Sequence, residues 1–262
     1  MLYRELAPIS KEAWSEIDER AVDVLKSYLS ARKVIKVNGP KGLDFNVITE
    51  GRLGKTEKDE DVSFANYNVQ PLTEVRVEFE MKRWELDNIS RGAKDIDFEP
   101  LEEGLRKIAL FEENAIYNGL KKSGIKGFND MVEKEEIKLG DNSKDIMEAI
   151  TKGVILLRES YTGGPYSLIV GKEAYKRIIS KDSGYPLEKR IENLIGGKIV
   201  LSHVVEGAYL VPFNSDDLEL TIGRDFSIGY QAHDGDNVKF FVAESFTFRI
   251  LDPTLIVKYV IL

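Results

Sequence analysis

Two neighbouring stretches decide the fold of this chain: residues 225–230, with the sequence DFSIGY, and residues 238–250, with the sequence VKFFVAESFTFRI. In the second stretch the even positions carry Val, Phe, Val, Glu, Phe, Phe and Ile, whereas the odd positions carry Lys, Phe, Ala, Ser, Thr and Arg. Side chains of a strand alternate between its two faces, so this period of two indicates a long strand. We expect one face of the strand to be buried and the other to be more hydrated.

Upstream of this strand, the pattern predicts two long amphipathic helices and a second alternating strand. Ser10 is a suitable N-cap for a helix that runs to about Ser30, with apolar side chains at spacings of three and four residues. Asp97 can cap the next helix, which has Pro100 in its first turn. Between the two helices, the strict alternation of residues 74–82 predicts a strand.

Two segments of the chain have no obvious partner. Residues 33–72 are weakly patterned and predict an extended hairpin that reaches outward, with the charged run 57–61 at its solvated tip. The apolar C-terminal residues 255–262 are expected to be buried or paired. The mixed order of helices and strands indicates an α+β fold. Further short elements are expected at residues 143–157, 166–170, 172–180, 186–196, 199–201, 208–211 and 218–222.

The composition is typical of a globular protein and excludes several function classes. The 262 residues, 42% of them hydrophobic, suit one large domain or two small intertwined ones. The absence of cysteine excludes disulfides and thiolate metal sites. The net charge is -8 without a basic tail, so we expect no nucleic-acid partner. Neither a long apolar run nor a signal-peptide pattern is present, so we expect no membrane partner and a cytoplasmic location.

Recognisable catalytic and metal-binding patterns are scarce. His203 and His233 are the only histidines and lack the spacing of a metal pair, so we expect both in strand-edge or turn positions. Residues 51–56, GRLGKT, are unlike a true phosphate loop because two residues, rather than four, separate the glycines. We therefore expect no metal site and no enzymatic activity, which favours a structural or binding role.

Trp84 and the two carboxylates near it are the remaining candidates for chemistry. Glu85 and Asp87 could serve acid–base chemistry if they shared one face, but such residues are more often solvated or paired with an arginine. Trp84 could lie in a core or an interface, or it could offer a flat surface on which an aromatic ligand stacks. We favour the core or interface.

Short motifs along nearly the whole chain carry a resemblance to a known family. They are LAPI at 6–9, IDER at 17–20, WELDNISRG at 84–92, KSGIKG at 122–127, GPY at 164–166, YPLEKR at 185–190, GKI at 197–199, DFSIGY at 225–230 and ESFTF at 244–248. In their order and spacing they resemble the encapsulins. Encapsulins are bacterial and archaeal shell proteins with the fold of tailed-phage major capsid proteins.

The resemblance implies a division of the chain into five segments. Residues 1–36 correspond to an N-terminal arm helix, and residues 37–72 to an extended loop that reaches a neighbouring subunit. Residues 73–130 and 218–262 correspond to the two parts of a peripheral domain. Residues 131–217 correspond to an axial domain, which meets its copies at symmetry axes.

The same resemblance implies self-assembly. A chain of this length resembles the members that form the smallest icosahedral shell, a homo-oligomer of roughly sixty copies. The outward hairpin and the apolar tail would then be buried only in the assembly. Encapsulin nanocompartments enclose a cargo enzyme, commonly a ferritin-like iron oxidase or a dye-decolorising peroxidase. Iron storage or oxidative-stress defence is therefore the expected theme.

Cargo binding implies a peptide groove on the inner wall of the shell. Family members bind the short C-terminal peptide of the cargo enzyme between the arm helix and the peripheral domain, as an extended segment. The apolar residues in the matching regions are Val24, Tyr28, Phe226, Ile228 and Tyr230. The alternative is that these side chains pack only on one another.

A loop around the five-fold opening is also implied by the resemblance. The residues of this five-fold loop would be Lys181, Asp182, Ser183, Gly184 and Tyr185, with Asp182 favouring cations. The alternative is that these residues form an ordinary loop between helices.

No cofactor is required in the family, although some relatives bind flavin near the residue that matches Trp84. A flavin-binding or hydrolytic enzyme is therefore one alternative function. A prophage major capsid protein is another. Capsid proteins of that kind are expected to carry a long N-terminal scaffolding segment, whereas this sequence begins directly with its helix.

Overall fold

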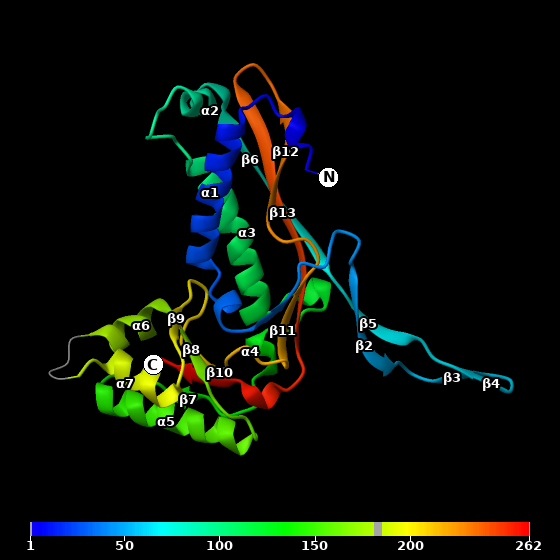
Figure 1. The fold of residues 1–262 in the computed structure, drawn as a ribbon. Coiled ribbons are helices and arrows are strands. Elements are labelled where there is room, and N and C mark those ends of the chain that lie inside the picture. Colours follow the sequence, from blue (N-terminus) through cyan, green and yellow to red (C-terminus); the bar gives the residue numbers. More distant parts are fainter. Residues whose placement is uncertain (1, 181–184, 262) are drawn as a thin grey trace.

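The computed structural model describes residues 2–180 and 185–261 and shows two sheet-centred parts, with a hairpin that projects to one side (Figure 1). The predicted mixture of helices and strands, an α+β fold, is confirmed. Residues 181–184, which belong to the expected loop before Pro186, lie outside the described residues. None of the described helices is long and apolar enough to cross a lipid bilayer.

The first sheet is built around one long strand, β13. Its strands lie in the order β1-β11-β13-β12. Strand β6 pairs with the edge of β13 that lies opposite to β12. All pairs are antiparallel except β1 with β11. The strands predicted at residues 74–82 and 238–250 are thereby confirmed. The strands of this sheet are β1 (Lys36–Asn38), β6 (Thr73–Lys82), β11 (Leu218–Ile222), β12 (Ser227–His233) and β13 (Asn237–Ile250).

The expectation of a hydrated face on β13 is wrong for most of its length. Residues 240–248 are buried on both faces of the strand. On the second face, the ring of Phe241 lies 4.0 Å from the guanidinium carbon of Arg76. Farther along, Gln70 from the hairpin donates a hydrogen bond to the Thr247 hydroxyl at 2.8 Å. Small and polar side chains on this face are therefore covered by other segments of the chain rather than by water.

Two long helices cover the first face of this sheet. Helices α1 (Lys11–Tyr28) and α3 (Glu99–Asn118) lie side by side against it (Figure 1). Ser10 is the N-cap of α1, as predicted, because its hydroxyl accepts a backbone N–H at 3.1 Å. The carboxylate of Asp97 accepts the N–H of Glu99 at 3.0 Å at the start of α3. The core between helices and sheet includes Ile17, Ala21, Phe79, Met81, Leu101, Leu105, Ile108, Val238, Phe240 and Val242.

The second sheet has the strand order β7-β14-β10-β8-β9 and is buried on both faces. One face packs on three helices through a core that includes Leu168 and Leu210, whereas the other face turns Ile169 and Tyr209 toward α3. The second sheet and its helices are β7 (Ile137–Lys138), β8 (Tyr166–Val170), β9 (Ile199–Leu201), β10 (Ala208–Pro212), β14 (Val257–Val260), α5 (Ser143–Glu159), α6 (Lys172–Ile179) and α7 (Leu187–Ile195). The short elements are α2 (Arg83–Ser90), α4 (Phe128–Met131), η1 (Arg4–Leu6), η2 (Ala31–Lys33), η3 (Lys121–Ser123) and η4 (Pro253–Leu255).

The C-terminal strand corrects the expectation that the apolar tail is buried only in the assembly. The apolar tail is paired, as predicted, but within the chain itself, because β14 lies between β7 and β10. Its side chains Val257 and Tyr259 are buried without any second copy. The tail therefore does not need an assembly to cover it. Residues 257–260 belong to the second sheet, whereas β11, β12 and β13 of the same expected segment, 218–262, belong to the first.

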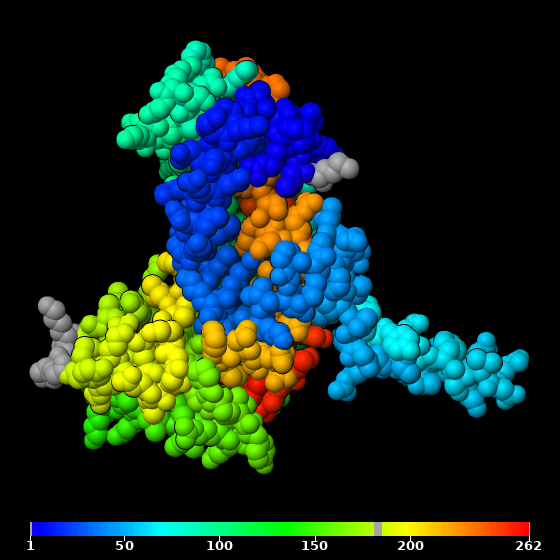
Figure 2. Space-filling view, viewed as in Figure 1, coloured from blue at the N-terminus to red at the C-terminus, as the bar shows by residue number. Residues whose placement is uncertain are grey.

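The hairpin is the one described segment that stands away from the body of the molecule (Figures 1 and 2). Strand β2 (Val47–Leu53) pairs with β5 (Tyr67–Pro71), and β3 (Glu57–Asp59) pairs with β4 (Val62–Phe64) at the tip. The predicted outward hairpin is therefore confirmed. Its large exposed apolar side chains are Leu53, Val62, Phe64, Tyr67 and Val69.

Phe240 on β13 should be among the most sensitive core positions. Its buried ring lies 5.4 Å from the Trp14 ring and 5.5 Å from the Phe79 ring, between centroids. Phe240→Ala is expected to lower the free energy of unfolding by about 3–5 kcal/mol, because a large cavity remains. Lys239→Ala, which loses only the exposed ion pair with Glu80, should cost about 0–1 kcal/mol. Denaturant midpoints check this, and equal midpoints for the two variants would contradict the assignment of this core.

Candidate functional site

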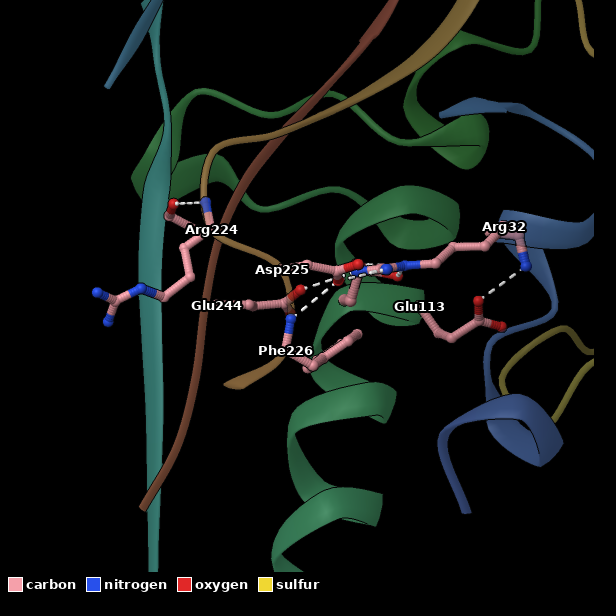
Figure 3. A network of polar contacts seen from close by, with 9 residues as sticks. Arg32, Glu113, Arg224, Asp225, Phe226 and Glu244 are labelled. Carbon is pink, nitrogen blue, oxygen red and sulfur yellow. Dashed lines mark hydrogen bonds and ion pairs between the residues drawn. The ribbon is translucent and has the colours of Figure 1, made fainter. Parts of the chain in front are cut away.

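The candidate site begins at Arg32, in the short turn η2 directly after the arm helix α1. Its Nη2 lies 2.5 Å from a carboxylate oxygen of Glu112 on α3 and 3.0 Å from one of Glu244 on β13. Its Nη1 lies 2.7 Å from Asp225, in the loop before β12. One guanidinium thus joins the arm, the long helix and two strands of the first sheet (Figure 3).

Burial makes it costly to ionise all the carboxylates of this cluster. Glu112 and Glu244 are fully buried, and Oε1 of Glu244 is without a hydrogen-bond partner among the described residues. Burial, followed by the charge of Glu112, raises the pKa of Glu244 well above its ordinary value. Burial opposes the charge on Arg32, but the carboxylates around it, Glu112 first, raise the pKa of Arg32 above its ordinary value. The guanidinium is therefore held charged, and Glu244 favours its protonated form.

A second carboxyl, Glu113, fixes the backbone just before Arg32. It accepts the N–H of Ala31 at 2.8 Å and a hydrogen bond from the Ser30 hydroxyl, which in turn lies 2.9 Å from the Tyr117 hydroxyl. Burial raises the pKa of Glu113 to about 7, although these hydrogen bonds act in the opposite direction. The consecutive residues Glu112 and Glu113 of α3 therefore hold the turn that ends the arm.

The Arg32 cluster also positions Phe226, the residue just before β12. The carboxylate of Asp225 accepts the backbone N–H of Phe226 at 2.8 Å. The guanidinium carbon of Arg32 lies 4.5 Å from the centroid of the Phe226 ring, a cation–π geometry. Phe226 is thereby held where it faces α1.

A groove with a volume of about 270 Å³ lies between α1 and β12. Phe226 and Ile228 form part of its wall on the sheet side, and α1 forms the opposite wall. The lining is mainly apolar, with one ion pair, Arg4 with Asp18 at 2.7 Å, beside it. The lining residues are Leu2, Arg4, Asp18, Ala21, Val22, Leu25, Leu105, Phe226, Ser227, Ile228 and Val242.

The structure divides the five expected peptide-binding residues between different places. Phe226 and Ile228 lie together in the groove. Val24 and Tyr28 line a separate hollow of about 440 Å³ on another side of α1, where the other lining side chains are mostly charged. Tyr230 lies farther along β12 and is nearly buried.

The N-terminal residues cover the part of β12 that contains Tyr230. The N–H of Tyr230 points away from β13 and donates to the carbonyl of Leu2 at 2.8 Å. In an antiparallel strand this orientation repeats every second residue, so the N–H and C=O of Ile228 also point away from β13. The edge of β12 next to Leu2 therefore presents main-chain groups beside an apolar groove.

Sequence reasoning missed the residues on the arm side of the groove. Val22 is 46% exposed and lines the groove, although it lies off the buried stripe of α1. An apolar residue on the polar face of an amphipathic helix was the available signal. Arg4 was missed because it acts through tertiary contacts: it pairs with Asp18 and lies 3.9 Å from the centroid of the Trp14 ring.

The other expected sites are not assembled within the described chain. Trp84 is 68% exposed, so the expectation that it lies in the core of the chain is wrong and an interface remains. The guanidinium of Arg91 lies 5.2 Å from the centroid of its ring, and nothing in this geometry supports a flavin. Tyr185, the described member of the expected five-fold loop, is exposed, and Lys181–Gly184 lie outside the described residues.

The histidines lie in different parts of the molecule. His203 follows β9, and its ring centroid is 4.7 Å from that of Tyr28; burial and two nearby lysines lower the pKa of His203. His233 ends β12, with Nδ1 2.5 Å from the Tyr230 hydroxyl. Over residues 2–180 and 185–261, no group of three or more suitable side chains could hold a metal ion.

Comparison with known proteins decides the family. A family profile described as "Encapsulating protein for peroxidase" matches residues 1–247. This chain belongs to the encapsulin family. It is 36% identical over 261 residues to a protein of Rhodospirillum rubrum named "Type 1 encapsulin shell protein", covering 96% of this chain and 93% of that protein.

Solved structures confirm the fold expected for an encapsulin. The virus-like particle of Pyrococcus furiosus matches with a TM-score of 0.66 at 18% identity, covering 93% of this encapsulin and 97% of that chain. The capsid of Myoviridae phage XM1 matches with a TM-score of 0.57 at 12% identity, covering 86% of this chain and 89% of the phage chain. The predicted fold of tailed-phage major capsid proteins is therefore confirmed.

The buried carboxyl of Glu113 should make the stability of this encapsulin depend on pH. Its pKa is raised from 4.5 to about 7, so its protonated form is stabilising below pH 4.5 and that contribution is lost as the pH rises through about 7. Glu113→Gln keeps a neutral group with the same shape. The melting temperature of the wild type is therefore expected to fall more than that of the variant between about pH 5 and pH 8.

A suitable control for this measurement is Glu219→Gln. Hydrogen bonds from Asn38 and Thr221 and the charge of Arg249 outweigh burial and lower the pKa of Glu219. Glu219 therefore titrates below the tested pH range. The melting temperature of Glu219→Gln should change with pH in parallel with that of the wild type. Parallel curves for Glu113→Gln and the wild type would contradict the assignment.

Proposed function

We propose that this encapsulin assembles with about sixty copies of itself into a closed icosahedral shell that encloses a cargo enzyme. The observation that carries the proposal is the projecting hairpin, whose large apolar side chains are left exposed by the residues that the structure describes (Figure 2). A two-stranded ribbon is at best marginally stable alone in water. In a capsid fold the available cover is a neighbouring subunit, which buries this surface by repeating the same contact around the particle.

Family membership and the capsid fold both support the role of a shell protein. Family membership also separates this role from the alternative functions. The capsid fold alone would also suit a prophage capsid protein. The match of the encapsulin profile to residues 1–247 favours a nanocompartment. A flavin-binding or hydrolytic enzyme has no support in the surroundings of Trp84 or of the two histidines described above.

The groove between α1 and β12 is our proposed receptor for the C-terminal peptide of the cargo. An extended peptide could pair with the outward main-chain groups of Ile228 and place alternate side chains between Phe226 and Val22. Val24 and Tyr28 lie in the separate hollow, and Tyr230 is covered by Leu2. The Ile228 side chain is itself 5% exposed, so we place the primary contacts at the Phe226 side chain and at the main-chain groups of Ile228.

The cargo class follows only from the comparisons. The matching family is described as encapsulating a peroxidase, which supports a dye-decolorising peroxidase and oxidative-stress defence. A ferritin-like iron oxidase, and with it iron storage, is the second candidate.

Assembly should depend on the apolar face of the hairpin. Val62→Asp combined with Phe64→Asp places charges where a neighbouring subunit is expected to bury apolar surface, so closed particles should be lost while the chain still folds. Electron microscopy and analytical ultracentrifugation check particle formation. The control Ser63→Asp adds a charge on the opposite face of β4 and should still assemble. Hollow particles from the double variant at wild-type yield would contradict the proposed contact.

Cargo loading should depend on the groove and not on assembly. Val22→Asp introduces a charge at an exposed groove position, so shells should form normally while cargo per shell falls more than about tenfold. The measurement is the cargo that co-purifies from co-expression with a peroxidase bearing its C-terminal peptide. Ser15→Asp, on the same helix outside the groove, is the control, and unchanged loading of Val22→Asp shells would place the receptor elsewhere.

A further inference from the structure

The carboxylates around Arg32 outnumber the positive charges available to them. Three carboxylates, those of Glu112, Asp225 and Glu244, lie within 3.0 Å of one guanidinium. Two of the three are fully buried. Full ionisation would leave an excess of two negative charges, which is costly away from water.

Within residues 2–180 and 185–261, the elements packed around this cluster supply no second cation. Among the described contacts, Arg32 is the basic side chain that reaches the three carboxylates, and the Arg224 side chain points away from them (Figure 3). Arg32 donates to one carboxylate oxygen of Glu244, whereas the other oxygen, Oε1, has no hydrogen-bond partner among the described residues. The titratable and charged groups that face the cluster are Arg32 from η2, Glu112, Glu113 and Tyr117 from α3, Asp225 from the loop before β12 and Glu244 from β13.

We propose that the Arg32 cluster is a proton-operated latch, in which one proton held on Glu244 keeps the end of the arm helix and the adjacent groove wall closed. Loss of that proton to water leaves Arg32 with three ionised carboxylates. The closed state is then less stable relative to a state in which the turn 30–33 separates from α3 and β13 and the carboxylates become hydrated.

The direction of the response follows from the two protonation states. Burial and the charge of Glu112 raise the pKa of Glu244 in the closed state, whereas hydration restores its ordinary value in the open state. The open state therefore binds fewer protons. The opening constant rises with pH by up to about tenfold per pH unit for this proton, until the closed-state pKa is passed.

The latch would connect two functional regions through one side chain. Arg32 ends the arm on one side, and through Asp225 and the cation–π contact it positions Phe226 in the groove on the other. The turn 30–33 and residues 224–230 should therefore loosen together, with the same pH dependence.

Hydrogen exchange on assembled full-length protein tests this without any cargo. Exchange of peptides that cover residues 29–36 and 224–230 is followed between about pH 6 and pH 9, corrected for the intrinsic pH dependence of exchange. Glu113→Gln is present in every sample, so that the titration of Glu113 does not contribute. The opening constant of both peptides should rise by up to about tenfold per pH unit with Glu244 present. It should change less than about twofold over the whole range with Glu244→Gln, which mimics the protonated carboxyl.

Glu219→Gln is the matched control, because it neutralises a partly buried carboxylate paired with a different arginine, Arg249. This variant should retain the full pH response. A flat response with Glu244 present, or an equal response with Glu244→Gln, overturns the latch. Should Glu244→Gln fail to form particles, Glu112→Gln removes one of the charges that oppose ionisation of Glu244, and its pH response must be weaker than that with Glu112 present for the proposal to stand.

Discussion

The rest of the structure depends on one largely buried cation. Arg32 is the point where the arm helix, the long helix α3 and the strands β12 and β13 are held together, and each of its partners comes from a different segment. Such a cluster is costly to bury and is therefore weak support for stability, but its geometry permits one arrangement of the segments. The consecutive glutamates of α3 hold the backbone and the side chain of the same turn.

Much of the fold could be predicted from local patterns. The alternation at residues 74–82 and 238–250 and the spacing of apolar residues after Ser10 depend on neighbours along the chain, and the structure has these elements. The second buried face of β13 could not be predicted, because Gln70, which covers it, is distant in sequence. The tail at 257–260 was correctly expected to pair, but its partners β7 and β10 follow from topology rather than from its own residues.

The candidate site was less accessible to such reasoning. Phe226 and Ile228 stand out as apolar residues beside a strand start, and they do line the groove. Glu112, Glu113 and Glu244 have no sequence signature, because charged residues in a helix or strand are usually solvated and these three are buried only through tertiary packing. Val22 illustrates the converse: it lies off the predicted apolar stripe of α1, so its exposure could be expected from the sequence, but its place in the groove could not.

The two chain ends differ in how they are anchored. The first described residues rest on the outer edge of β12 through Leu2 and on α1 through Arg4, next to the groove. The last strand is enclosed between two others in the second sheet. A polypeptide genetically fused ahead of Leu2 would start beside the groove and compete for it, whereas one fused after β14 would start from a tightly held strand in the other half of the molecule. The choice of fusion end therefore determines which half of the subunit an added domain would crowd.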